Sequence, residues 1–334
     1  MILKKLTQLC LLLPLLMAMS PVYAKAIKIA TISPDGTLWM NEMRAGAKEI
    51  KKRTQGRVVL KFYPGGVMGS DENVLRKMRI GQLQGGAVTT GSLTGVYSDI
   101  DIYSLPYLFS SLEQVSYVRE KMDQFLLDQL EKRGFVSFGF GEGGFTYMMS
   151  ESSLYTVEDV RKQKVWIPGG NKVGEAVFSS AEISPVTLPV SDVLTGLQTG
   201  LVNTVITSPI GAIALQWHTR VKYVIDVPLT YIAAILVIDK KVFNKINKED
   251  QTIVREVMSA AFKRIDAANR RDNFAAQEAL KQQGIKYISL PKKSLDAWYA
   301  IGDKAITKLK KDNSYAPAIY KKLMAHVNAA KAKK

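Results

Sequence analysis

The stretch that decides the fold is residues 164–209, KVWIPGGNKVGEAVFSSAEISPVTLPVSDVLTGLQTGLVNTVITSP. A short apolar strand at 165–167 stops at a proline and two glycines, and a helical run follows. A second strand leads to Pro189, a helix then ends at Gly200, and residues 201–206 form a third strand. The order strand, helix, strand, helix, strand, with short turns between them, predicts a parallel sheet that carries helices on its faces.

The N-terminal part of the chain shows the same alternation. The helix before the third strand is expected to begin at Ser70 or Asp71, and the helix after the first strand should end near Thr54. Three apolar segments in this part predict strands: residues 26–32, 58–63 and 87–90. The sequence therefore predicts two α/β units in succession.

Both units resemble the solute-binding proteins of tripartite ATP-independent periplasmic (TRAP) transporters, the dicarboxylate-binding-protein family. In the first unit the resemblance is carried by KFYPGGVMGSDENVLRKMRIGQLQGGAV (residues 61–88) and DIYSLPYLFSS (residues 101–111). In the second unit it is carried by residues 164–209. The ordered pieces span nearly the whole chain after its first 24 residues. The resemblance implies an α/β fold, namely a two-lobed periplasmic binding protein of type II, TRAP-type.

The resemblance also implies how the chain divides between the lobes. Residues 1–24 would be a cleaved signal peptide, residues 25–140 with about 236–268 domain I, and residues 141–235 with about 285–334 domain II. The lobes would close on the solute through hinges near residues 139–144 (GFGEGG) and 234–237. The first of these segments is expected to lie between a strand at residues 135–138 and another at residues 146–149.

Residues 247–283 contain neither glycine nor proline. As a single helix this run would extend roughly 55 Å, more than one lobe. The family has a long helix that lies across both lobes, and this segment resembles it. Two ordinary helices with a break near Asn269 are the alternative, given typical helix lengths.

The N-terminus predicts export. Lys4 and Lys5 precede an apolar core at residues 6–17, and a small-x-small cleavage signal ends at Ala24. Cleavage there would also remove Cys10, the single cysteine. The mature chain would then be periplasmic and would hold no disulfide, metal thiolate or cysteine nucleophile.

The chain is basic, with a formal net charge of +16. A basic balance favours nucleic acid, an anionic membrane or an acidic ligand as partner, but nucleic acid does not suit an exported protein. Many of the lysines lie in residues 304–334. We expect this segment to be a solvated, partly frayed C-terminal helix, and docking on an acidic partner is the alternative.

Recognisable catalytic signatures are missing from the sequence. His218 and His326 are the two histidines, and nothing matches HExxH, GxSxG or a phosphate-binding glycine loop. His218 is typical of a packing or helix-surface residue. We therefore expect a binding protein with no cofactor and no metal. A periplasmic enzyme with paired carboxylates remains the alternative, because distances between carboxylates are not visible in a sequence.

In an open α/β fold the ligand lies at the carboxyl ends of the strands. Some of the residues that this rule selects have another possible role: Trp39 can pack on the core, Thr90 and Gly91 can form a polar helix cap, and Glu142 can be a hinge charge. Nine residues are expected to bind the ligand: Trp39, Thr90, Gly91, Glu142, Phe145, Trp166, Thr207, Ser208 and Trp217.

Position 166 departs from the family's pattern. The resemblance implies an arginine here that clamps the substrate carboxylate, and an asparagine where this chain has Thr207, with Ile206 in place of an acidic or amide neighbour. Trp166 offers an apolar face, one N–H donor and a surface for stacking or cation–π contact, but no bidentate fork. Core packing is the alternative role for Trp166.

We therefore predict a solute with a sizeable apolar or aromatic body. Monocarboxylic acids belong to this class, because backbone amides at helix N-termini can hold a carboxylate without arginine. Small C4-dicarboxylates should bind poorly, since neither of their charges would find a guanidinium fork at position 166.

The resemblance implies two further partners, the small and large integral membrane subunits of a TRAP permease driven by an ion gradient. The binding protein itself is expected to be a monomer. A binding protein that feeds a sensor or another class of transporter is the alternative.

Overall fold

The structure is a computed structural model that describes residues 26–333, so the predicted signal peptide lies outside the described residues. In the first unit, β1 pairs in parallel with β2 on one side and β3 on the other. Hydroxyl side chains of Thr37, Ser70 and Ser111 cap α1, α2 and α3. The elements are β1 (Ile27–Thr31), α1 (Leu38–Arg53), β2 (Leu60–Tyr63), α2 (Asp71–Arg79), β3 (Gly85–Thr89), η2 (Thr90–Leu93), η3 (Ser98–Ser104) and α3 (Leu112–Lys132).

The second unit confirms the order predicted for residues 164–209. β5 pairs in parallel with β6, and a parallel bridge from Val165 to Thr204 joins β5 to β7. Gly200 ends α6 in the left-handed conformation, φ 71°, which glycine adopts without strain. The elements are α4 (Val157–Arg161), β5 (Trp166–Ile167), α5 (Lys172–Ser180), β6 (Val186–Thr187), η4 (Val190–Asp192), α6 (Val193–Thr199), β7 (Thr204–Thr207), α7 (Pro209–Ala214), η5 (Trp217–Thr219) and β8 (Tyr223–Ile225).

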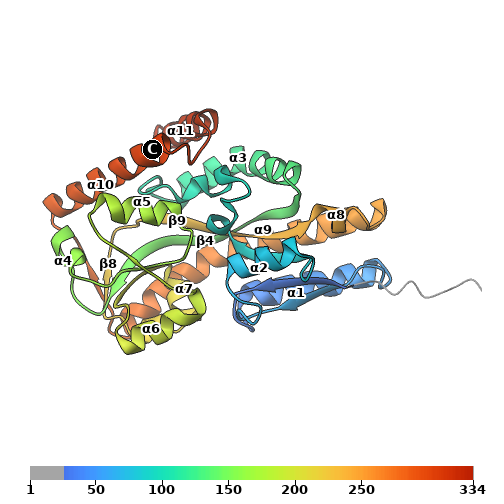
Figure 1. The fold of residues 1–334 in the computed structure, drawn as a ribbon, viewed down its shortest axis with the longest axis horizontal. Coiled ribbons are helices and arrows are strands. Elements are labelled where there is room, and N and C mark those ends of the chain that lie inside the picture. The colour runs from blue at the N-terminus through green and yellow to red at the C-terminus, as the bar shows by residue number, and fades with distance from the viewer. Residues whose placement is uncertain (1–25, 334) are drawn as a thin grey trace, which may run out of the picture.

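Two long strands join the units. β4 (Phe135–Ser150) and β9 (Thr230–Asp239) pair antiparallel through the middle of the molecule, with α1 and α2 on one side and α4, α6 and α7 on the other (Figure 1). β9 also pairs with β3, and the far end of β4 pairs with β7 and β8. One sheet of order β10-β8-β4-β9-β3-β1-β2 results, with β7 beside β4.

The glycine-rich segment 139–144 was expected to lie between two strands. It lies inside the single strand β4, so that expectation is wrong. Register shifts between Ser137 and Phe140, and between Glu142 and Gly144, absorb the glycines without ending the strand. Gly144 has φ 92°, a conformation that side-chain-bearing residues avoid.

The long helix is confirmed as one element. α9 (Lys248–Gln282) continues through Asn269 without a break, so the two-helix alternative is wrong. It packs against α1 of the first unit, β4 in the middle and α7 of the second unit, and it runs across the molecule in Figure 1. The short helix α8 (Lys240–Phe243) precedes it, and β10 (Lys286–Ile288) follows it.

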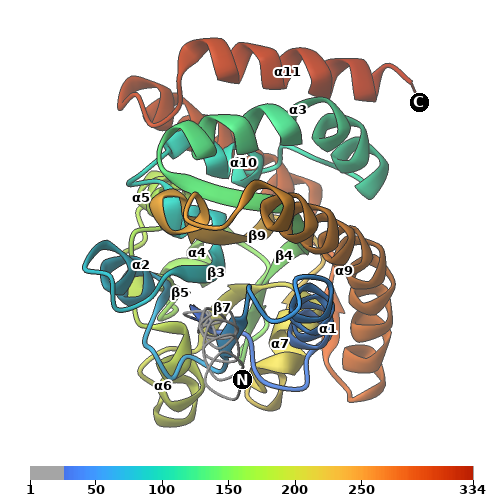
Figure 2. The same cartoon turned by 90° about the vertical axis from the view of Figure 1, so that its right-hand side faces the viewer.

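The basic C-terminal segment forms two packed helices, not one frayed helix. α10 (Lys292–Lys311) packs against α5, and α11 (Pro317–Lys331) lies along α3 (Figure 2). Leu323 and Val327 are fully buried, and this apolar face holds α11 in place while its lysines face solvent. Within residues 26–333, no helix combines the length and the apolar character that crossing a membrane requires.

Candidate functional site

A cavity of about 280 Å³ lies where the strand ends of the two units meet. The first unit contributes the residue after β1, the start of α2, and the segments η2 and η3. The second unit contributes the turns after β5 and β7. The crossing strands add Thr146, Ile232 and Ala233. The strand-end rule therefore leads to a real cavity, lined by segments that are far apart in the chain.

Six of the nine predicted site residues line this cavity. The lining is mainly apolar: it includes Phe178 and Leu215, together with valine, other leucine, isoleucine and proline side chains. The predicted residues that line the cavity are Thr90, Gly91, Trp166, Thr207, Ser208 and Trp217.

Trp166 takes part in both the cavity wall and the core of the second unit. Its ring lies edge-on to Trp217, with 5.0 Å between the ring centroids. The indole N–H donates to the Leu188 carbonyl oxygen at 2.9 Å. The N–H donor that the sequence suggested for a ligand is therefore used by the protein, and Trp166 offers the cavity only apolar surface.

The hydroxyl groups of Thr90 and Ser208 in the cavity are also engaged within the protein. The Thr90 hydroxyl donates to Asp101 Oδ1 at 2.6 Å and lies 3.2 Å from the Ala233 carbonyl oxygen. Ser208 caps α7, accepting from the Gly211 N–H at 3.3 Å. The polar-cap role that was left open for Thr90 is thus replaced by a buried hydrogen bond to an acid.

The charged side chains that line the cavity are all acidic. Asp71 and Glu72 come from the first turn of α2, and Asp101 comes from η3. Lysine, arginine and histidine do not occur among the cavity-lining residues of the described chain. The described residues that line the cavity therefore include no cation with which a carboxylate could pair.

Asp71 and Asp101 are buried, with 7% and 5% of their surfaces exposed. Asp71 Oδ2 accepts from the backbone N–H and the hydroxyl of Thr89, both at 2.8 Å, while its Oδ1 is buried without a hydrogen-bond partner in the chain. Asp101 Oδ1 accepts from Thr90 and from the Ser104 hydroxyl. Burial raises the pKa of each carboxyl group to about 6, against these hydrogen bonds, which lower it.

Trp39 and Phe145 do not line the cavity. Trp39 packs edge-on against Phe262 of α9 and lies so close to Gly141 that a Cβ there would overlap its ring. This is the core-packing role that was left open for Trp39. Phe145 packs edge-on against Tyr231, with 5.9 Å between the ring centroids.

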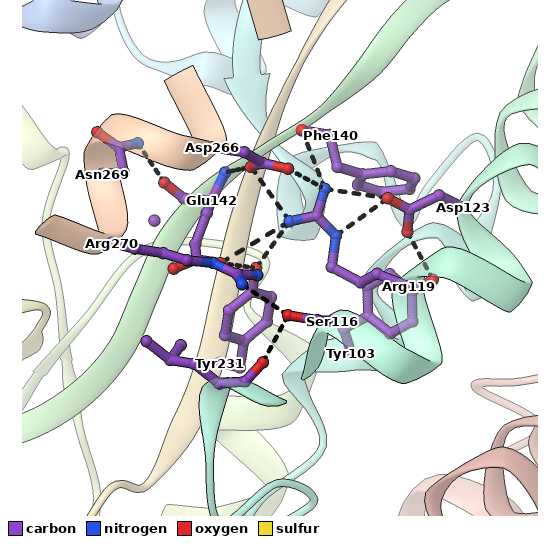
Figure 3. A network of polar contacts seen from close by, with 12 residues as sticks. Tyr103, Ser116, Arg119, Asp123, Phe140, Glu142, Tyr231, Asp266, Asn269 and Arg270 are labelled. Carbon is purple, nitrogen blue, oxygen red and sulfur yellow. Dashed lines mark hydrogen bonds and ion pairs between the residues drawn. The ribbon is translucent and has the colours of Figure 1, made fainter. Parts of the chain in front are cut away.

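Glu142 also lies away from the cavity, in a buried polar network where α9 crosses β4 (Figure 3). Arg270 Nε donates to Glu142 Oε2 at 2.9 Å, and the Tyr231 hydroxyl donates to the same oxygen at 3.2 Å. Arg119 lies 4.0 Å from Oε2. With these partners, Glu142 has an ion pair that fastens the long helix to the crossing strand, and its expected role toward a ligand finds no support in its position.

Arg119 of α3 is the centre of this network (Figure 3). Its guanidinium donates to Asp123 at 3.0 Å, to Asp266 at 2.8 Å and to the Phe140 carbonyl oxygen at 3.1 Å. Asp266 in turn accepts from the Glu142 backbone N–H at 2.6 Å. Four elements, α3, β4, β9 and α9, are thereby connected through buried charge-assisted hydrogen bonds.

Sequence reasoning missed Asp71 and Asp101 as cavity residues. Asp71 was recognised only as a possible helix start, because an acid in the first turn of a helix usually just complements the helix dipole. Asp101 lies in the segment DIDIYS, whose alternation gives no sign that the acid is buried. The burial of both depends on how the two units meet, which local patterns do not reveal.

Residues 29–312 match the family described as bacterial extracellular solute-binding protein, family 7 (DctP), and the chain belongs to this family. A curated relative is the C4-dicarboxylate-binding periplasmic protein DctP of Rhodobacter capsulatus. It is 23% identical over 252 residues, which cover 74% of this chain and 75% of that protein.

Solved structures of similar fold include a TRAP periplasmic solute binding protein from Xanthobacter autotrophicus Py2 with bound β-D-galacturonate. It has a TM-score of 0.82 at 17% identity, and the match covers 90% of this chain and 99% of that chain. DctP7 of Bordetella pertussis, an extracytoplasmic solute receptor binding pyroglutamic acid, has a TM-score of 0.82 at 20% identity, covering 91% and 100%. These matches confirm the predicted two-lobed α/β binding-protein fold with its long helix.

Proposed function

We propose that this chain is the solute-binding subunit of a TRAP transporter, which captures an organic solute with a sizeable apolar body and delivers it to a small and a large integral membrane subunit. It would act as a monomeric periplasmic protein after removal of residues 1–24, without cofactor, catalysis or nucleic acid. Membership in the extracellular solute-binding family supports the binding role. The observation that carries the solute class is the cavity, whose wall is mainly apolar and includes Trp166 and Trp217.

An apolar body would be bound mainly through burial of its surface. Covering an indole-sized face of roughly 100 Å² contributes about 2.5 kcal/mol at the usual area coefficient. The polar groups that could orient a solute are few, because the Trp166 N–H and the Thr90 hydroxyl already have partners within the protein. Selectivity should therefore depend on the shape of the apolar body and on one polar head group.

Small dicarboxylates fit this cavity poorly. The Rhodobacter relative carries the name of a C4-dicarboxylate-binding protein. In this chain the cavity-lining residues within 26–333 include no cation that could pair with a carboxylate, and Asp71 and Asp101 would repel it. Succinate and malate are therefore expected to be weak ligands.

Closure of the two units on the solute is the proposed mechanism of capture. The units are joined by β4 and β9, with the glycine positions of β4 and the segment 234–237 of β9 as the proposed hinges. Closure would bury the solute from both sides. Small-angle scattering should show a smaller radius of gyration when a stabilising solute is present, and an unchanged radius with every stabilising solute would contradict capture by closure.

A thermal-shift screen tests the solute class. Dicarboxylates, sugar acids, aromatic acids, amines and neutral apolar solutes should be compared at one concentration. Solutes with an apolar or aromatic body should raise the melting temperature most. Strong stabilisation by succinate or malate that persists in Trp166→Ala would contradict the proposal. Solute uptake that continues in a strain without the two membrane subunits would argue against the TRAP permease as partner.

A further inference from the structure

The head group of the solute can be inferred from the charges in the cavity, and this inference rests on the proposed solute-binding function. The cavity combines apolar walls with two buried acids, Asp71 and Asp101, and a third, more exposed acid, Glu72. Neither Asp71 nor Asp101 forms an ion pair with another described residue. A buried carboxylate without a cation is costly, so the cavity favours an occupant that supplies one.

Asp71 has one carboxylate oxygen that no described residue donates to. Its side chain lines the cavity and is 7% exposed, and one of its oxygens, Oδ1, has no hydrogen-bond partner in the chain. The other oxygen accepts two hydrogen bonds from Thr89. The carboxyl group is thus held by one oxygen, while the other lies buried beside the cavity with its hydrogen-bonding capacity unused.

Asp101 is arranged in a similar way. Thr90 and Ser104 both donate to Oδ1, at 2.6 and 2.8 Å, whereas no described residue donates to Oδ2. Gly91 lies beside it, and a Cβ placed at Gly91 would be 3.7 Å from Oδ2. A residue with no side chain thus leaves room next to this oxygen.

We propose that the solute is an organic cation, a protonated amine with an apolar or aromatic body. The ammonium group lies at the acidic wall that Asp71, Glu72 and Asp101 form, and the body packs against Trp166 and Trp217. An ammonium group supplies several N–H donors and a full positive charge, which matches two acceptor oxygens better than a hydroxyl does. Aromatic rings in the same wall add a favourable interaction with the cation.

The helix N-termini at the cavity do not offer an alternative site for a carboxylate. α2 already carries Asp71 and Glu72 in its first turn, so its positive end is neutralised by its own residues. At α5 the Asn171 side chain accepts from the Gly174 N–H. An anionic head group would therefore meet engaged amides and two acids of its own sign.

Three compounds with nearly the same body separate the head groups: phenethylamine, phenylacetate and phenethyl alcohol. Calorimetric titration of the purified protein at pH 7.5 should give measurable binding for phenethylamine and at least about tenfold weaker binding for the other two. A parallel thermal-shift series with alkyl and aryl amines and their matching acids covers other body shapes.

Two variants test the contacts, Asp71→Asn and Asp101→Asn. Each should weaken amine binding by at least about thirtyfold, because a buried charge pair loses one partner. Asp99→Asn is the matched control, since Asp99 is equally buried, at 6% exposed, but does not line the cavity. The control should bind the amine like the parent protein. The head-group series on the unaltered protein decides the question even if a variant does not fold.

The outcomes separate the two proposals. The inference is supported if amines bind more tightly than the matching acids and alcohols, and if their affinity falls in Asp71→Asn and Asp101→Asn but not in Asp99→Asn. Acids or alcohols that bind as well as their matching amines overturn it, while the solute-binding function stands. A panel in which no amine stabilises the protein overturns it as well. Failure of every solute class would count against the proposed function itself.

Discussion

The buried acids where α9 crosses β4 and the buried acids of the cavity differ in what surrounds them. Glu142 and Asp266 lie against the guanidinium groups of Arg270 and Arg119, within 3 Å in each case. Asp71 and Asp101 have hydroxyl and backbone N–H donors but no cation among the described residues. Both sites remove carboxylates from water, and only the first compensates this loss with charges of the protein itself.

This contrast indicates which charges are structural and which serve a ligand. The network at the crossing pairs its acids with arginines of the protein, although Glu142 Oε1 is buried without a hydrogen-bond partner in the described chain. It fixes the long helix on the strands that join the units. The cavity acids have no cation beside them. Burying them therefore costs folding free energy that no contact with a positive charge of the protein offsets. A binding site for a cation requires acids that have no cation of the protein beside them. The difference between the two groups of acids can be tested by mutation and by titration.

The largest effect is expected from breaking the network where α9 crosses β4. Arg119→Met keeps most of the side-chain volume but removes the guanidinium from Asp123 and Asp266. Unpaired buried acids should lower the free energy of unfolding by about 3–5 kcal/mol, measured by urea denaturation. Arg44→Met, which breaks an exposed ion pair with Asp35, is the control and should leave stability nearly unchanged. Equal losses in both variants would contradict the structural role of the network.

The second prediction concerns a substitution that introduces a cation into the cavity wall. Trp166→Arg should place a guanidinium near Asp71 and Asp101, so the affinity for amines should fall by roughly tenfold or more while small carboxylates gain affinity. Titration calorimetry with phenethylamine and succinate measures both changes. Trp166→Ala is the control and should weaken both ligand classes without a gain for succinate. Undiminished amine binding in Trp166→Arg would show that the cation binds elsewhere.

The third prediction concerns pH. The pKa of Asp71 and Asp101 is about 6 in the folded protein, above the ordinary value, so the folded state binds more protons between about pH 4 and 6. Glu72 raises the pKa of Asp71 further, and Tyr315 is the titratable group near Asp101. The free energy of unfolding of the ligand-free protein should therefore rise by roughly 1 kcal/mol for each acid when the pH falls from 7.5 to 5.

Urea denaturation at the two pH values measures this gain. In a variant with both Asp71→Asn and Asp101→Asn the gain should largely disappear, because neither side chain can take up a proton. Amine binding should change in the opposite direction and weaken at pH 5, where both acids are mostly neutral. A parent protein and a double variant with the same pH dependence would rule out the raised pKa values.

The smallest effects are expected from a matched pair of serines. Ser104 donates to Asp101 in the cavity, whereas Ser116 accepts from Arg270 in the network. Each serine-to-alanine change should cost about 1 kcal/mol of unfolding free energy. Ser104→Ala should also raise the pKa of Asp101 further, since it removes a hydrogen bond to the charged form. The same pKa of Asp101 in both variants would argue against this hydrogen bond.

Much of the fold could be predicted from the sequence because its signals are local. Proline and glycine marked the ends of the elements in residues 164–209, and the uninterrupted run 247–283 predicted α9. The glycines of residues 139–144 misled the interpretation, since they suggested a connection between two separate strands. In the structure they allow register shifts and the close approach of Trp39 within one continuous strand.

The candidate site could be predicted only in part. The strand-end rule led to six residues of the cavity, because it depends on topology alone. It also selected Glu142, whose partners come from α3 and α9, far away in the chain. Asp71 and Asp101 went unrecognised because their burial in the cavity likewise depends on contacts between segments that are distant in the sequence. Whether an acid is buried, and whether a cation reaches it, is decided by tertiary contacts that no local pattern encodes.

The carboxyl groups of Asp71 and Asp101 themselves provide the most direct test. Selective ¹³C labelling of aspartate, with assignment through Asp71→Asn and Asp101→Asn, allows both to be titrated by NMR in the free protein and with saturating phenethylamine. We expect both to titrate near pH 6 in the free protein, and the amine to lower both pKa values clearly, because it stabilises the charged forms. Titration near the ordinary aspartate value in the free protein, or pKa values that the amine leaves unchanged, would contradict the account.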